Sequence, residues 1–538
     1  MAEVGLRKMY LEGKTGRGPF LWDSGNSRPN ILVISVDMVP QEFAFKDRAA
    51  IPVHTPNLDS LRRQGVFFRN VFATSPLCSP SRASYLTGRY SYITSNAERG
   101  HDGHAFHLRD QDIMFPEYLK AVGYHTRHSG KCHVGARRFL ELFGENDAPW
   151  DRWSPPWYDD EQYIDSLKRQ GLERFDFERL IYGGQTRGGE RGNFYGGWIA
   201  AQRGRPFPKQ ATYSAFLVDR AISFLQTEKP FYLQLDFFAP HQPFAIPSGM
   251  EQREAELRRV MMLPDSYGEL AENNFNSPQG EPRVYRLYRK NWGMWDAQTL
   301  LDYRVANQLQ YELIDELLGK LFGDLQDRGL YDCTWIAVLG DHGEMNGELA
   351  LIDKGAFLHP RVVRAPLWLK PPKDFPLAER GRDTDGLCSL LDLAPTILEI
   401  SGIESPERLD GWSLLSTAAG ATRPQDKPVI FEVWNHVVPN PCVGTVFSGS
   451  DGRQYSFVFN AADDRDELYR LGTDADSPNC LEDPDMEQIR IEGIRALTTR
   501  MEADPRWFAY SQYLRLEHSE FLPRGAGDRQ LFVGKNDG

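Results

Sequence analysis

Short apolar runs alternate with longer amphipathic stretches along most of the chain. Three runs have the length of a strand and are largely apolar, with β-branched or aromatic residues, at residues 31–36, 231–235 and 335–339. Apolar residues recur every three or four positions in other stretches, clearest at residues 56–64, 213–226 and 297–326, as they do in helices that cover a sheet. The alternation predicts an α/β fold with helices on both faces of a sheet.

Residues that commonly ligate metals follow these predicted strands. Asp37 comes directly after the first run, His241 lies just beyond the second, and Asp341 and His342 follow the third. Ligands of open α/β sheets bind beyond the carboxyl ends of the strands. We therefore expect these side chains to collect at one edge of the sheet.

Two parts of the chain depart from this alternation. Residues 147–209 are rich in tryptophan, tyrosine, arginine and glycine, which predicts an elaborated loop region over the site. After about residue 422, hairpin-like stretches at 429–433, 445–447 and 454–459 precede a predicted helix at 486–501. We expect an N-terminal extension (1–28), a main domain (29–422) and a smaller C-terminal α+β subdomain (423–538).

Composition narrows the class of protein. The chain has 538 residues, and its 75 acidic residues outnumber 62 lysines and arginines, for a net charge of −13. This balance argues against nucleic-acid or membrane-surface binding by bulk charge. The six cysteines lack metal-site or disulfide-framework spacing, and no apolar run has the length of a secretory signal or membrane span. We expect a cytoplasmic protein, or a periplasmic or secreted one if a signal was removed.

The strongest chemical signal is the segment LCSPSRASYLTGR at residues 77–89. Ser79 and Pro80 are typical N-cap and N1 residues, so we expect Cys78 at a helix start where backbone N–H groups bind anions. Such a position would lower the pKa of the thiol, and Arg82 would add a fixed positive charge. By themselves these residues indicate a thiol hydrolase or a phosphatase.

The same segment, CSPSR followed by LTG, resembles the motif of the type I sulfatases, a family of the alkaline phosphatase superfamily. The resemblance continues through most of the chain, in TPNLD (55–59), GKCH (130–133), PHQP (240–243), DHGE (341–344), Lys354, DLAPT (392–396) and ELY (467–469). It implies a large mixed sheet sandwiched between helices, as in alkaline phosphatase, with a smaller C-terminal α+β subdomain. Residues 29–422 would then be the catalytic sulfatase domain.

The resemblance also implies roles for individual residues. Cys78 would be converted to formylglycine by a maturase, and its hydrated form would attack sulfur and later expel sulfate. Arg82 would fix this group and the sulfate. Lys131 would hold sulfate and His133 would take a proton from the second hydroxyl.

Further matches complete this expected site. His241 and Lys354 match the family residues that contact the scissile oxygen and protonate the leaving group. Asp37, Asp341 and His342 match ligands of a divalent metal, for which mostly oxygen donors favour Ca²⁺, with Mn²⁺ or Mg²⁺ as alternatives.

One position departs from the family pattern. Met38 stands where the family usually has a second aspartate or an amide, and a thioether is a poor ligand for a hard cation. Water or another oxygen, with Gln41 and Glu42 close in sequence, would complete the metal shell, or metal binding would be weaker. The spacing of His101, His104 and His107 suggests a second metal, but we interpret them as loop residues near the substrate.

The leading hypothesis is a sulfuric ester hydrolase acting on a sulfated carbohydrate, possibly a glycosaminoglycan-type oligosaccharide. The aromatic and arginine residues of 147–209 favour it, because rings stack on sugars and arginines bind sulfate or uronate groups. A phosphonate monoester or phosphodiester hydrolase of the same superfamily is the alternative enzyme. A third hypothesis, which Met38 and the need for a maturase motivate, is a catalytically silent protein that binds sulfated glycans.

Overall fold

The structure is a computed structural model, which describes residues 28–45, 52–90, 108–144, 149–183, 192–200, 206–225, 230–375, 380–404, 408–424, 427–462, 465–472 and 478–522. Residues 1–27 of the expected N-terminal extension, and the histidines at 101, 104 and 107, lie outside these residues. Within the described residues, we find no helix with the length and apolar character that crossing a membrane requires.

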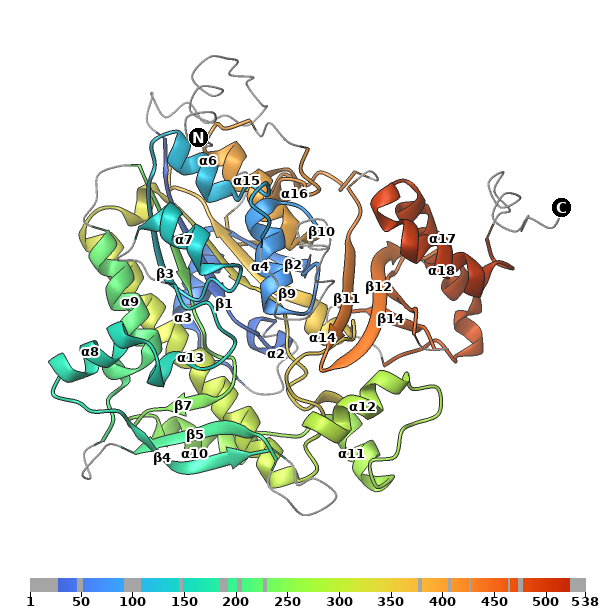
Figure 1. Ribbon diagram of the computed structural model, residues 1–538, viewed down its shortest axis with the longest axis horizontal. Coiled ribbons are helices and arrows are strands. Elements are labelled where there is room, and N and C mark those ends of the chain that lie inside the picture. Colours follow the sequence, from blue (N-terminus) through green and yellow to red (C-terminus); the bar gives the residue numbers. More distant parts are fainter. Residues whose placement is uncertain are drawn as a thin grey trace, which may run out of the picture.

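A seven-stranded sheet forms the centre of the molecule (Figure 1). Its strands, in spatial order, are β10 (Arg382–Ser389), β2 (Val66–Phe72), β9 (Arg364–Lys370), β8 (Thr334–Gly340), β1 (Asn30–Val36), β6 (Phe231–Asp236) and β3 (His125–Gly130). β9 runs antiparallel to both neighbours, and the other pairs are parallel. The predicted α/β fold with a large mixed sheet is confirmed.

Helices cover both faces of this sheet. Successive side chains of each buried strand point to opposite faces, so they pack into two separate cores. In β1, Leu32 and Ile34 pack with one group of helices, whereas Ile31 and Val33 pack with the other. The first group is α3 (Pro56–Gln64), α9 (Tyr213–Phe224) and α13 (Ala297–Asp327). The second is α4 (Cys78–Thr87), α6 (Phe115–Ala121), α7 (Ala136–Phe143), α15 (Leu393–Ile400) and α16 (Leu414–Ala418).

Much of the aromatic segment 147–209 is regular, although we expected a loop region. It contains α8 (Glu161–Arg169), β4 (Asp176–Tyr182) and β5 (Phe194–Ala200), and β5 pairs with β7 (Phe244–Ile246). Its glycines permit close strand contact: a Cβ at Gly196 would lie 2.1 Å from the Phe244 backbone nitrogen. This three-stranded sheet lies below the central sheet in Figure 1, near α10 (Glu251–Val260), with α11 (Asp265–Glu272) and α12 (Arg283–Trp292) at the same end.

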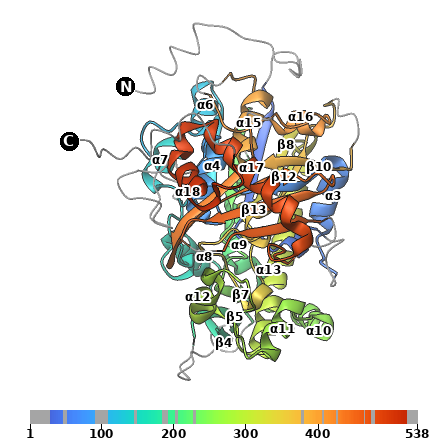
Figure 2. The same ribbon diagram turned by 90° about the vertical axis from the view of Figure 1, so that its right-hand side faces the viewer.

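The C-terminal part contains a second, antiparallel sheet, whose strands in order are β11 (Ile430–His436), β12 (Val438–Ser448), β13 (Gln454–Asn460) and β14 (Glu467–Leu471). One face packs against α17 (Glu487–Glu502) and α18 (Phe508–His518), which lie toward the viewer in Figure 2. The other face shares a core with the main part of the molecule, where Phe431 stacks on Phe72 of β2. The second sheet is therefore joined to the first by a continuous apolar core.

Candidate active site

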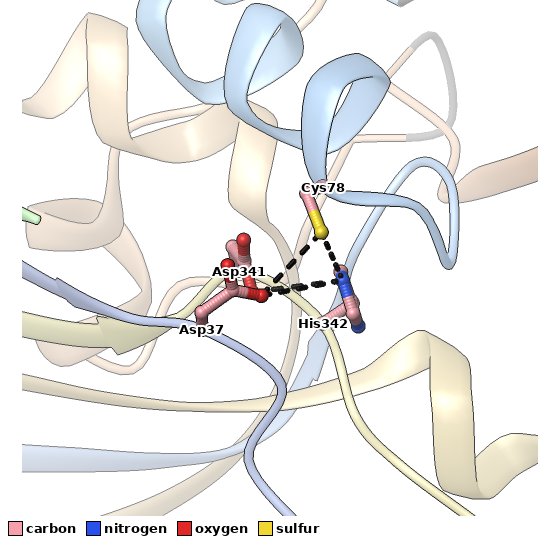
Figure 3. A group of neighbouring side chains, drawn as sticks. All are labelled: Asp37, Cys78, Asp341 and His342. Atoms are coloured by element: carbon pink, nitrogen blue, oxygen red, sulfur yellow. Dashed lines mark hydrogen bonds and ion pairs between the residues drawn. The ribbon is translucent and has the colours of Figure 1, made fainter. Parts of the chain in front are cut away.

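The register of the central sheet brings the expected metal ligands together. β1 and β8 are adjacent and parallel, and Val36 pairs with Gly340. Asp37 and Asp341 are consequently the next residues at the same edge of the sheet, with His342 beside them. Helix α4 begins at this edge with Cys78. Figure 3 shows the four side chains directed toward one another from these three segments.

The four side chains form a tight, fully buried cluster. Their ligand atoms all lie within 4.8 Å of one another. The Cys78 Sγ is 3.4 Å from the Asp37 Oδ1 and 3.2 Å from the His342 Nε2. The same imidazole nitrogen is 3.9 Å from Asp37 and 3.8 Å from Asp341.

The donor set fits a divalent cation. The Nδ1 of His342 lies 2.8 Å from the carbonyl oxygen of Gly343, so Nδ1 carries the proton and Nε2 is left with a lone pair toward the cluster. Burial lowers the pKa of His342, which favours this neutral form. Asp37 and Asp341 add carboxylate oxygens, which Ca²⁺, Mn²⁺ and Mg²⁺ accept.

Met38 takes part in this site through its backbone. Its N–H donates to the Asp341 Oδ1 over 3.0 Å, in a left-handed conformation with φ of 65°. Gln41 and Glu42, which we considered as additional ligands, have other partners. The Gln41 amide donates to the carbonyl of Pro360, and the Glu42 carboxylate accepts from Arg361. Neither joins the cluster.

Two buried cations, Arg82 and Lys131, neutralise the carboxylates. The Arg82 guanidinium is 2.9 Å from Asp341 and 3.6 Å from Asp37, and the Lys131 Nζ is 2.5 Å from Asp37. Burial would raise the pKa of the Asp37 carboxyl, but the charges of Lys131 and Arg82 hold it well below its usual value. The carboxylate is therefore ionised and available to a metal.

A third carboxylate, Asp236, was not predicted. It ends β6 and contacts Arg82 at 3.7 Å, the Ser35 hydroxyl at 2.5 Å and the His128 Nε2 at 2.9 Å. Three buried carboxylates thus face two buried cations, and the uncompensated negative charge suits a bound divalent cation. The signal was present in the sequence, because Asp236 follows a predicted strand just as Asp37 does.

Cys78 differs in two ways from the prediction made for a reactive thiol. Helix α4 begins at Cys78 itself, with Leu77 as N-cap, so Ser79 and Pro80 lie inside the first turn. Burial and the Asp37 carboxylate raise the pKa of the thiol to about 12, against the opposing charges of Lys131 and Lys354. The expected lowering of this pKa is wrong, and an unmodified Cys78 is a poor nucleophile at neutral pH.

His241 and Lys354 form a second group beside the cluster. The Lys354 Nζ lies 2.8 Å from the His241 Nε2 and 3.0 Å from Asp353. The His241 Nδ1 lies 2.5 Å from the Gln242 carbonyl, so the Nε2 accepts from the ammonium. Burial and the Lys354 charge lower the pKa of His241 to about 3, whereas Asp353 keeps the pKa of Lys354 above its usual value. Lys354 is therefore the protonated member.

His133 lies two residues beyond Lys131 in the same buried segment, with a left-handed φ of 55°. Burial and the charges of Lys131 and Arg82 lower its pKa well below the usual value. His133 is consequently neutral and able to accept a proton.

A pocket of about 570 Å³ opens beside Lys354 and His241. Four further stretches line it: residues 153–155 and 193–195 of the aromatic segment, Trp292 at the end of α12, and residues 435–437, where β11 ends and turns into β12. His436 of this turn had no local sequence signal, since it comes from the C-terminal sheet. Trp153, Phe194, Tyr195 and Trp292 contribute aromatic rings to the lining.

The described arginines of the aromatic segment do not line this pocket. The Arg174 guanidinium lies 3.6 Å above the ring of Tyr158, and that of Arg179 lies 3.8 Å above Trp198. Arg179 also pairs with Glu254 at 2.7 Å. These contacts hold the two guanidinium groups beside their rings, and a role of these arginines in binding sulfate or uronate groups stays a prediction.

Comparisons with known proteins agree with this geometry. The profile of the family named Sulfatase matches residues 29–403. A second profile, described as N-sulphoglucosamine sulphohydrolase, C-terminal, matches residues 347–503 and so includes the second sheet.

Individual relatives are similar over most of the chain. The multifunctional alkaline phosphatase superfamily protein PehA of Trinickia caryophylli is 26% identical, over 90% of this chain and 91% of the relative. An N-acetylglucosamine-6-O-sulfatase of Bacteroides thetaiotaomicron is 25% identical, over 72% of this chain and 70% of the relative. The solved phosphonate monoester hydrolase of Agrobacterium radiobacter has a TM-score of 0.65 at 19% identity, covering 92% of this chain and 96% of its own.

Proposed function

The chain belongs to the type I sulfatase family of the alkaline phosphatase superfamily, and we propose that it removes sulfate from a sulfated carbohydrate through a formylglycine made from Cys78. The observation that carries the proposal is the convergence of Cys78 with Asp37, Asp341 and His342, beside the cations that neutralise them. A buried thiol with a raised pKa has little use as a nucleophile, whereas its conversion to an aldehyde explains the position.

Each group of side chains has a distinct task in this proposal. A hydrated formylglycine supplies one hydroxyl that attacks sulfur and a second whose deprotonation later releases sulfate, so no water has to attack the sulfur. Arg82 and Lys131 bind the sulfate oxygens and stabilise the charge that develops on them. His133, which is neutral, accepts the proton of the second hydroxyl.

Lys354 donates a proton to the leaving alcohol. Its ammonium has one N–H toward His241 and one toward Asp353, which leaves the third for the scissile oxygen. When the S–O bond breaks, its electron pair stays on this oxygen and the proton of Lys354 neutralises it. His241 orients the ammonium by accepting from it.

Asp37, Asp341 and His342 would hold the divalent cation, which neutralises sulfate oxygens and orients the nucleophile. We propose Ca²⁺, with Mn²⁺ or Mg²⁺ as alternatives, because the set combines two carboxylates with one imidazole. Elemental analysis of the purified protein identifies the ion.

The pocket beside Lys354 would bind the alcohol part of the substrate. Aromatic faces such as those of Trp153 and Trp292 stack on sugar rings. The Bacteroides relative, named as an N-acetylglucosamine-6-O-sulfatase, supports a sugar substrate. Turnover on a panel of defined sulfated mono- and oligosaccharides tests this assignment, and failure on all of them would exclude it.

A phosphonate monoester or phosphodiester is the second candidate substrate. The Asp341–His342 pair motivates it, because relatives that use formylglycine with an Asp–His metal pair also cleave phosphorus esters, and PehA, which is similar over nine-tenths of the chain, is named as a multifunctional member of the superfamily. Comparing kcat/KM for an aryl sulfate with that for an aryl phosphonate separates the two. Mass analysis of the Cys78 peptide first establishes maturation, because formylglycine replaces a thiol by an aldehyde; an unconverted, inactive protein would support the silent glycan-binding hypothesis.

A further inference from the structure

Asp353 holds Lys354 in place from an uncommon backbone conformation. It is a buried residue with φ of 68°, in the left-handed region that non-glycine residues seldom adopt. Its Oδ1 accepts from the Lys354 Nζ at 3.0 Å and from the Lys354 backbone N–H at 2.9 Å. The direction of the ammonium therefore depends on how the Asp353 backbone is fixed.

Two consecutive residues, Glu344 and Met345, hydrogen-bond to the backbone N–H and carbonyl of Asp353. The Glu344 Oε1 accepts its N–H at 2.6 Å, and its carbonyl accepts the N–H of Met345 at 3.0 Å. Only Gly343 separates these residues from the Asp341–His342 pair. The metal ligands and the proton donor are thus joined by one short, hydrogen-bonded connection.

Glu344 is itself anchored to the longest helix of the described chain, α13. Its carboxylate accepts from the Tyr303 hydroxyl at 3.2 Å and from the Asn307 amide at 3.1 Å, and it is fully buried. Tyr303 packs edge-to-face on Phe244, with 4.8 Å between ring centroids. Glu344 is therefore held rigidly between a helix and the Asp353 backbone.

We propose that Glu344 is a positioning residue for proton donation to the leaving group, acting through Asp353 on Lys354. Glu344 touches no reacting atom and gives up no proton. Its carboxyl group fixes the left-handed backbone conformation of Asp353. That conformation orients the Asp353 side chain, which in turn orients the Lys354 ammonium. This inference rests on the proposed function, because it needs Lys354 to be the acid.

The test uses the dependence of rate on the leaving group, in protein that carries formylglycine. An ester with a good leaving group, 4-nitrophenyl sulfate, needs little protonation, whereas an alkyl or sugar sulfate needs a full proton transfer. Loss of a general acid costs about 10²–10⁴-fold in rate. For Glu344→Ala we expect kcat to fall about 30-fold or more on the sugar sulfate but less than about 3-fold on the nitrophenyl ester, since acid catalysis is impaired and not lost.

Three further variants separate positioning from a general loss of structure. Glu344→Gln keeps an acceptor for the Asp353 N–H, and the Asn307 Oδ1, which has no partner in the described part of the chain, can receive the new amide; we expect near wild-type behaviour. Asp353→Asn suits the left-handed turn but removes the charge, so it should repeat the selective loss even if Glu344→Ala does not fold.

Asp315→Asn is the matched control. Asp315 is a second buried residue with a carboxyl group, itself on α13, and it accepts backbone N–H groups of Asn57 and Leu58 at the start of α3. Its substitution should lower the free energy of unfolding without changing the dependence on the leaving group.

The outcomes distinguish failure of the proposed function from failure of the role proposed for Glu344. If the wild type hydrolyses no sulfate ester, the proposed function fails and this inference fails with it. If the wild type is active but Glu344→Ala and Asp353→Asn lose rate equally on both esters, the inference alone is overturned. Metal content is measured in every variant, because equal loss accompanied by loss of metal would assign Glu344 to the metal site instead.

Discussion

The backbone N–H of Met38 donates to the carboxylate of Asp341 across the junction of β1 and β8. The position that departs from the family pattern thus orients a proposed metal ligand through its main chain. Any residue that tolerates φ of 65° can make this backbone contact, although the buried side chain must still fit the space that Met38 fills.

Substitution of Met38 therefore separates side-chain from backbone effects. Met38→Leu has similar volume and should leave metal affinity and turnover nearly unchanged. Met38→Asp tolerates the left-handed conformation and adds a carboxylate, so we expect tighter metal binding. Calorimetric titration of metal-free protein measures both, and weaker binding by Met38→Leu would show that the thioether itself matters.

Cys78→Ser should abolish multiple turnover. A serine supplies one hydroxyl, so it can accept sulfate but lacks the second hydroxyl that releases it. We expect a stable sulfate ester on residue 78, seen by intact-mass measurement after incubation with substrate. Sustained turnover near the rate of the matured enzyme would contradict the formylglycine assignment.

Removal of the metal should abolish activity and leave the fold largely intact, because the cluster lies at a sheet edge. Chelation is the cleaner experiment. Asp341→Ala also removes one of the three buried carboxylate partners of Arg82, so it lowers stability as well as metal binding. Activity that persists in protein shown to be metal-free would refute the proposed roles of Asp37, Asp341 and His342.

Acid should destabilise the protein partly through His436. Burial, with the Lys354 charge, lowers the pKa of His436 to about 4, below the value of about 6.5 in an unfolded chain. Between these values the unfolded state binds more protons, so stability is lost as pH falls from about 6.5 to 4, by up to about 3 kcal/mol. Denaturant unfolding at several pH values should show a smaller decline for His436→Gln; equal declines would mean that this imidazole titrates normally.

Trp153→Ala should weaken binding of a sugar substrate with little effect on stability. The Trp153 ring lines the pocket but is 61% exposed, so its loss should change the free energy of unfolding by only about 0.5 kcal/mol. Loss of ring stacking should raise KM about 10-fold, the equivalent of about 1.4 kcal/mol. Tyr513→Ala, a comparably exposed aromatic residue on α18 outside the pocket, is the control. Equal KM values for Trp153→Ala and wild type would exclude a stacking role.

The parts of the fold that were predictable are those with strong local patterns. The strand that leads to Asp37 and the helix over 56–64 follow from apolar runs and periodicity, and the structure places them within a residue. The alternation of apolar runs with amphipathic stretches also predicted that the metal-type ligands collect at one edge of the sheet, because the carboxyl ends of parallel strands meet there.

Other features depend on contacts between distant segments, which periodicity does not contain. Gly196 and Gly197 were interpreted as loop glycines, yet they lie in a strand whose neighbours approach too closely for a side chain. The pKa of Cys78 was misjudged because the helix start is buried against Asp37, and burial outweighs the helix dipole. His436 reaches the pocket only through the packing of the second sheet.

The two ends of the proposed substrate would be recognised by separate pieces of polypeptide. Strand ends of the central sheet surround the anion, whereas the walls around the alcohol come from the 153–155 and 193–195 segments, α12 and the 435–437 turn. Insertions and turns tolerate exchange far better than strands buried on both faces. Transplanting these four wall segments is consequently a route to enzymes with new alcohol preferences and unaltered sulfate chemistry.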